Sequence, residues 1–109
     1  MQSPKPYHEV RPWGEELWLT RDLSAPSMVK VITVNPGEAL SLQFHHDRDE
    51  YWVVISGDGK AEIGQDNIPL QKGVSCFVPR ETQHRVTGGD APLIFVEMTF
   101  GKFDEADIV

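Results

Sequence analysis

Short apolar stretches rich in β-branched residues recur along much of the chain, which is the pattern of β-strands. The clearest segments are residues 28–34, 51–55, 74–78 and 93–100, which are rich in valine, isoleucine and phenylalanine. Turn-forming residues separate these segments, and no segment has the 3.6-residue period of an amphipathic helix. The pattern therefore predicts an all-β fold, either a sandwich or a barrel.

The beginning of the chain has a different composition. Residues 1–16 contain three prolines and a glycine, which interrupt regular elements and predict an irregular arm laid over the domain. We expect the β-domain itself at residues 17–100 and a short tail at residues 101–109. A chain of 109 residues has room for one core, so we expect a single domain and no second catalytic domain.

One stretch in the middle of the chain carries candidate chemistry. Alternation over residues 40–45 places Gln43 and His45 on the same strand face. The polar segment 46–49 predicts a hairpin turn that returns Glu50 to the side of His45. An amide oxygen, an imidazole and a carboxylate on one face suit a divalent metal ion. The alternative is a half-buried polar face whose side chains only hydrogen-bond one another.

The opposite face of the same segment is apolar. If Gln43 and His45 point inwards, then Leu40, Leu42 and Phe44 point outwards as a contiguous row, which is unusual on a small soluble monomer. The N-terminal arm could cover this row within one chain. A second copy would bury more surface, so we expect a homodimer whose interface includes this face.

Charge and composition limit the classes of binding partner and the cellular location that we expect. The net charge is −7, with 17 acidic and 10 basic residues, which disfavours nucleic acid and anionic membranes but allows a small anionic ligand bound by local cations. No apolar run approaches the ~20 residues of a membrane span, and the N-terminus lacks a signal-peptide core. The single cysteine, Cys76, is expected to be a buried small hydrophobe. These features predict a cytoplasmic protein.

The spacing of the candidate ligands resembles the first cupin motif, G-x5-H-x-H-x4-E-x6-G. The chain matches it at Gly37, His45, Glu50 and Gly57, with Gln43 in place of the first histidine. This resemblance implies a single-domain cupin, a jelly-roll barrel also called a double-stranded β-helix.

A second cupin motif, G-x5-P-x-G-x2-H-x3-N, follows. The chain matches it at Gly73, Pro79 and His84, with Glu81 and Gly88 in place of the glycine and the asparagine. The resemblance implies that His84 is a fourth metal ligand. We therefore expect one divalent ion per chain, zinc first, with manganese, cobalt, nickel and iron as alternatives.

A narrower resemblance covers nearly the whole chain. Short segments, in the same order, are similar to the C-terminal isomerase domain of type II mannose-6-phosphate isomerases: residues 11–14, 34–38, 40–43, 45–46, 52–57, 84–85 and 107–109. The resemblance implies a metal-dependent aldose–ketose isomerase, an intramolecular oxidoreductase that interconverts mannose 6-phosphate and fructose 6-phosphate. The chain has no glycine-rich nucleotide loop, so GDP-mannose synthesis is not predicted.

Isomerisation needs a Lewis acid and a base that moves a proton between C1 and C2. Lys30 and Glu97 are the candidates for the base, although each could equally be a salt-bridge or surface residue. Arg80 and Arg11 are the candidates for binding the phosphate of a sugar phosphate. Two other functions stay open: a metal- or sugar-binding module without turnover, and a non-haem metal oxygenase.

Overall fold

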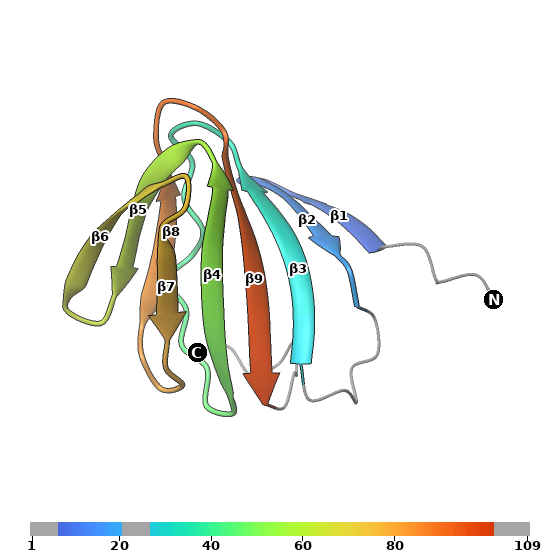
Figure 1. The fold of residues 1–109 in the computed structure, drawn as a ribbon, viewed down its shortest axis with the longest axis vertical. Coiled ribbons are helices and arrows are strands. Elements are labelled where there is room, and N and C mark those ends of the chain that lie inside the picture. Colours follow the sequence, from blue (N-terminus) through green and yellow to red (C-terminus); the bar gives the residue numbers. More distant parts are fainter. Residues whose placement is uncertain (1–6, 21–26, 102–109) are drawn as a thin grey trace.

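The computed structural model describes residues 7–20 and 27–101. This part of the chain is all-β and holds two antiparallel sheets (Figure 1). The strands are β1 (Tyr7–Arg11), β2 (Gly14–Trp18), β3 (Ser27–Val34), β4 (Arg48–Ser56), β5 (Asp58–Ile63), β6 (Asp66–Gln71), β7 (Ser75–Val78), β8 (His84–Gly88) and β9 (Leu93–Gly101).

The larger sheet has six strands in the order β1-β2-β3-β9-β4-β7, and the smaller sheet has three in the order β6-β5-β8. Figure 1 shows the C-terminal strand β9 lying between β3 and β4. This architecture confirms the predicted all-β cupin fold. In the described ranges no helix is long and apolar enough to cross a membrane; the cytoplasmic location stays a prediction.

The core lies between the two sheets and contains alternate residues of their strands. Along β4 the side chains are buried and half-buried in turn, so that Trp52 and Val54 face inwards. Ile32 and Phe95 of the larger sheet and Ala61 of the smaller sheet belong to the same core cluster. The polar residues of the candidate site interrupt the inner face on which these apolar residues lie.

The described part of the predicted arm is a β-hairpin. Strands β1 and β2 pair with each other, and β2 pairs with β3 from Gly14↔Val34 to Trp18↔Lys30. Pro12 does not prevent this pairing, because it lies in the turn between the two strands, where a proline is well tolerated. The hairpin therefore extends the larger sheet.

The segment around residue 42 differs from the prediction. It is not a continuous strand but is held by isolated bridges, Ala39↔Thr87 and Gln43↔His84. Without strict alternation, Leu40 packs against the core, whereas Leu42 is 48% exposed. The predicted outward position of Leu40 is therefore wrong, and the homodimer itself stays a prediction.

Candidate metal centre and adjoining pocket

Three buried side chains form a cluster with the geometry of a metal centre. One ligand atom each from His45, Glu50 and His84 lie within 4.8 Å of one another. Glu50 lies on β4 of the larger sheet and His84 begins β8 of the smaller sheet. His45 precedes β4 in the extended segment. The two cupin motifs therefore meet between the sheets.

Glu50 is the centre of the cluster. Its Oε2 lies 3.2 Å from His45 Nε2, and its Oε1 lies 3.8 Å from His84 Nε2. The indole Nε1 of Trp52 donates a hydrogen bond of 3.0 Å to Oε1. These contacts fix the carboxylate between the two imidazoles.

A second hydrogen bond sets the orientation of His84. Its Nδ1 lies 3.1 Å from the carbonyl oxygen of Thr82, so Nδ1 carries the proton and donates to that carbonyl. The Nε2 lone pair is then directed to Glu50 and the cluster. Metal-binding histidines are commonly held in this way, with one nitrogen on a carbonyl and the other on the metal.

The protonation states also suit a cation. Burial would raise the pKa of Glu50, but hydrogen bonds from His45 and Glu97 and the charges of His84 and Arg48 outweigh it and hold that pKa far below 4.5. Burial lowers the pKa of His84 below 6.5, despite the opposing charge of Glu50. At neutral pH the cluster therefore offers a carboxylate and a neutral imidazole, the forms that bind a divalent metal.

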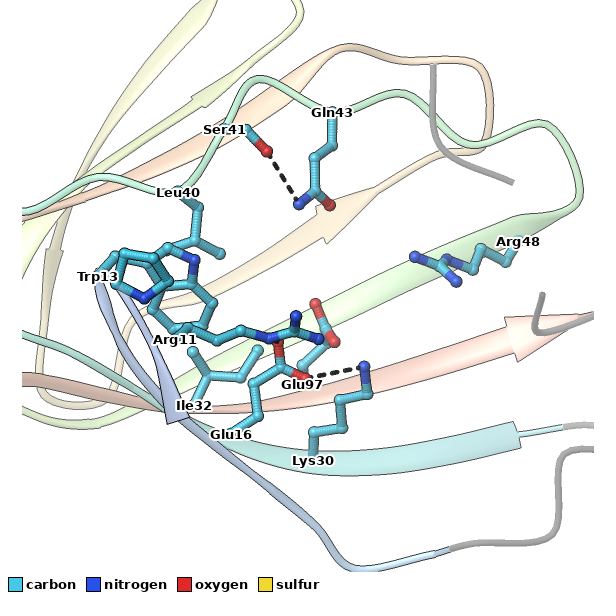
Figure 2. A pocket seen from close by; sticks show the side chains of 11 residues that line it. Arg11, Trp13, Glu16, Lys30, Ile32, Leu40, Ser41, Gln43, Arg48 and Glu97 are labelled. Atoms are coloured by element: carbon cyan, nitrogen blue, oxygen red, sulfur yellow. Dashed lines mark hydrogen bonds and ion pairs between the residues drawn. The ribbon is translucent and has the colours of Figure 1, made fainter. Parts of the chain in front are cut away.

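Gln43 lies beside the cluster. Its backbone N–H and carbonyl both bond the backbone of His84, at 2.9 Å each, so the two side chains share one face. Figure 2 shows the Gln43 amide above the pocket, with Nε2 3.5 Å from the Ser41 hydroxyl. Gln43 and His84 also line the same small cavity. The role of Gln43 as a ligand stays a prediction.

A larger pocket of about 380 Å³ adjoins the centre. Its wall is polar and carries three cationic side chains, Arg11, Lys30 and Arg48. Figure 2 shows Arg48 and Lys30 pointing towards the middle of this pocket. Arg48 also joins the pocket to the centre, because its Nη2 lies 3.0 Å from His45 Nε2.

Two acidic side chains lie among these cations, and only one of them, Glu16, forms ion pairs with two of the cations. Glu16 Oε1 lies 3.3 Å from Lys30 Nζ, and Glu16 Oε2 lies 3.2 Å from Arg11 Nε. Although burial opposes it, the neighbouring Lys30, together with Trp18 and Arg11, lowers the pKa of Glu16. The second carboxylate, Glu97, behaves differently: burial and the nearby Glu50 raise its pKa well above 4.5.

The structure therefore brings together most of the predicted residues. Lys30, Glu97 and Arg11 line the pocket beside the metal cluster. Arg80 does not line it; its guanidinium is half exposed and pairs with Asp49 at 3.3 Å.

Two charged residues of the pocket, Glu16 and Arg48, were missed by the sequence analysis. Buried and exposed residues alternate along β2, which places Glu16 on the inner face. The sequence analysis assigned this segment to an irregular arm and therefore did not consider such an alternation. Arg48 was assigned to a turn, whereas it begins β4 with a buried side chain.

The centre should make stability sensitive to acid. As pH falls through 6.5, an unfolded chain takes up a proton on His84 that the folded chain does not, so the free energy of unfolding should decrease. This loss can reach at most about 1.4 kcal/mol per pH unit for one group. Urea titrations of the metal-free protein from pH 7 downwards would measure it.

A His84 variant separates the contribution of this histidine from those of the carboxyl groups. The pKa of Glu97 is raised in the folded protein, so its contribution to the free energy of unfolding increases as pH falls, opposite to that of His84. We expect the decrease below pH 6.5 to be smaller in His84→Gln than in the wild-type protein. Equal curves for wild type and His84→Gln would contradict the lowered pKa.

The match to a known family covers this site and almost all of the sequence. Residues 3–109 match the family described as mannose-6-phosphate isomerase C-terminal. The chain belongs to this family. The family assignment made from the motif spacing is thereby confirmed, together with the cupin fold.

Relatives within the family correct the predicted activity. The xanthan biosynthesis protein XanB of Xanthomonas campestris is 39% identical over 91% of this chain and 21% of its own length. The mannose-1-phosphate guanylyltransferase of Escherichia coli is 39% identical over 91% and 20%. The alginate biosynthesis protein AlgA of Pseudomonas aeruginosa is 36% identical over 85% and 19%. The chain thus spans about a fifth of these relatives.

The predicted aldose–ketose isomerase, and with it the enzyme class of intramolecular oxidoreductases, is therefore wrong. The relatives are named for guanylyl transfer and polysaccharide biosynthesis, not for isomerisation. The physical reason is that cupin motif spacing specifies a metal-binding fold, and one fold supports many reactions. The base role of Lys30 and Glu97 belonged to the isomerase reaction and is not carried further.

Solved structures agree on the fold. The cupin-2 domain protein Rru_A2000 from Rhodospirillum rubrum has a TM-score of 0.79 at 17% identity, over 98% of this chain and 81% of its own. The capsular polysaccharide assembling protein CapF from Staphylococcus aureus has a TM-score of 0.80 at 20% identity, over 97% and 32%. At these identities the likeness shows the cupin fold alone.

Proposed function

We propose that this chain is a metal-binding cupin module that binds mannose 1-phosphate without itself turning it over. The observation that supports this most is the pocket in which Arg11, Lys30 and Arg48 lie next to the His45–Glu50–His84 cluster. Three cations around one pocket are unusual in a chain of net charge −7. A local excess of positive charge suits a phosphorylated ligand.

The metal would be held by His45, Glu50 and His84, with Gln43 as the fourth ligand. Zinc is the metal we favour, because two imidazoles, a carboxylate and an amide suit it. A bound divalent ion would act as a Lewis acid towards ligand oxygens. The buried indole of Trp52 supports this site by holding Glu50 in place.

The phosphate would be bound by Arg11 and Lys30. Both already lie within ion-pair distance of Glu16, which orders them at the pocket wall. Lys30 Nζ also lies 4.1 Å from the centre of the Trp18 ring, which restricts its position further. Cations ordered in advance lose less conformational entropy when they bind an anion.

The names of the relatives suggest mannose 1-phosphate as the ligand, because three of them are called mannose-1-phosphate guanylyltransferases. Trp13 lines the pocket and would offer an aromatic face to the sugar ring. The proposal concerns binding by this chain; the guanylyl transfer named for the relatives is not assigned to it.

Isothermal titration calorimetry with the zinc-loaded protein tests the proposal. We expect mannose 1-phosphate to bind at least about tenfold more tightly than mannose, since the phosphate gains charge-assisted hydrogen bonds. Lys30→Met should lose this preference, whereas Lys72→Met, at an exposed turn, should keep it. Equal binding of mannose and mannose 1-phosphate, or no effect of Lys30→Met, would contradict the proposed phosphate site.

A further inference from the structure

The larger sheet has one face that no described element covers. Its inner face packs on the smaller sheet and carries the core and the pocket. We call the opposite side the outer face. The outer face is formed by alternate residues of five strands, which are Glu15, Leu17, Val29, Val31, Thr33, Asp49, Tyr51, Val53, Ile55, Ser75, Phe77, Ile94, Val96, Met98 and Phe100.

Strand register arranges these residues in continuous apolar rows. One row runs across the sheet through Leu17, Val31, Val96, Val53 and Ser75. A neighbouring row runs through Val29, Met98, Tyr51 and Phe77. Side chains at directly paired positions within a row lie about 5 Å apart, and residues i and i+2 of one strand lie about 7 Å apart, so the two rows make one contiguous surface.

This surface is free of charge. A quarter of all residues in the chain are charged, yet none lies in either row. Ile55, Phe77 and Phe100 are 47%, 52% and 45% exposed. A contiguous apolar surface of this kind marks an interaction site rather than an ordinary solvated face.

Polar pairs lie at its margins. His8 and Glu15, on the outward side of the β1–β2 hairpin, contact each other at 2.7 Å. At another margin Asp49, next to Phe100, pairs with Arg80 at 3.3 Å. An apolar centre with a polar rim is the usual anatomy of a protein–protein interface.

We infer that the outer face is the interface between two copies of this chain. Copies of net charge −7 repel each other, which favours association through a surface with an uncharged centre, and among the described strands the outer face provides one. Twisted sheets pack face to face about 10 Å apart, and a two-fold axis lets one apolar face satisfy itself.

The size of the outer face fits a stable dimer. Five strands about 4.8 Å apart, averaging about seven residues in length, cover roughly 24 by 23 Å, or about 550 Å² in projection. The accessible area of a rough surface exceeds its projection, and the polar rim adds to it. The total approaches the roughly 800 Å² per partner of a standard interface.

This interface differs from the one expected at Leu42. Leu42 lies beside the smaller sheet, where it lines an open depression with Glu62 and Arg85. The metal cluster and the pocket lie on the inner side of the larger sheet, so each copy would keep its own site intact. Substitutions on the outer face should therefore change assembly and leave metal binding unchanged.

Sedimentation equilibrium of the full chain tests the inference. We expect a dimer at micromolar concentration, and we expect Val96→Glu at the centre of the apolar row to weaken it at least about 100-fold, because a buried unpaired charge costs several kcal/mol. Leu42→Glu, on the other surface, is the matched control and should remain dimeric.

Phe77→Glu, at a more exposed position of the outer face, should also dissociate the dimer. If Val96→Glu fails to fold, the result with Phe77→Glu decides whether the outer face is the interface. Circular dichroism and metal content should match wild type in every variant that is interpreted. A monomeric wild type, or a dimer that Leu42→Glu dissociates and Phe77→Glu does not, would overturn the inference.

Discussion

His84→Ala is expected to weaken binding of a divalent metal by at least about 100-fold, so that no stoichiometric metal survives dialysis. His84 is the member of the cluster that comes from the smaller sheet, whereas Glu50 comes from the larger sheet and His45 from the segment before it. Without the His84 imidazole, the remaining ligands of the cluster, His45 and Glu50, come only from β4 and the segment before it. Competition with a chromophoric chelator measures the affinity.

A second histidine provides the control. His8 is exposed and pairs with Glu15 on the β1–β2 hairpin, remote in sequence from both motifs. His8→Ala should bind metal as wild type does. A His84→Ala protein that keeps one tightly bound ion would show that His84 is not a ligand.

Gly57→Ala is expected to lower the free energy of unfolding by at least about 3 kcal/mol. Gly57 has a positive φ of 84°, and an added Cβ would collide with the carbonyl oxygen of Pro92. It would also lie 2.9 Å from Leu93 Cα. These obstacles are backbone atoms at the start of β9, so no side-chain rotation can relieve them. Urea denaturation followed by tryptophan fluorescence measures the loss.

Gly73→Ala is the control that separates the cost of a steric collision from the cost of placing alanine at a positive φ. Gly73 also has a positive φ, of 89°, but an added Cβ would meet no atom within 4 Å. The substitution should therefore cost only the conformational penalty of about 1 kcal/mol. Equal losses for Gly57→Ala and Gly73→Ala would show that the contact with Pro92 does not matter.

Apolar, β-branched segments predicted the strands best where one face of the strand is buried. Segments 28–34 and 93–100 correspond closely to β3 and β9, because the core imposes a period of two on these strands. Segment 40–45 also alternates, but only isolated bridges pair it, so Leu40 turns inwards. Alternation alone cannot distinguish a strand from an extended loop.

The candidate site was predictable to the extent that it depends on motif spacing. His45, Glu50 and His84 were found in this way, and the structure brings them together. The pocket was harder to predict, because Glu16 on β2 and Arg48 on β4 are far apart in the sequence and lie together only after distant strands have paired. Such long-range pairing is not encoded in any local pattern of residues.

The function was predicted least well. The isomerase was inferred from a resemblance that specifies a fold and a metal site, and the relatives are named for other activities. Nothing in residues 37–57 or around His84 distinguishes a metal site that turns over its ligand from one that only binds it. Whether a bound ligand is turned over depends on the side chains that surround it, and the same fold can carry many different sets of such side chains.

The metal centre itself is tested most directly by X-ray absorption and elemental analysis of the zinc-loaded wild-type protein. The structure predicts one zinc per chain, bound only by nitrogen and oxygen ligands at about 2.0 to 2.2 Å, with scattering from two imidazoles. Less than a tenth of an equivalent of zinc after dialysis, or a sulfur ligand at about 2.3 Å, would contradict a centre built from His45, Glu50 and His84.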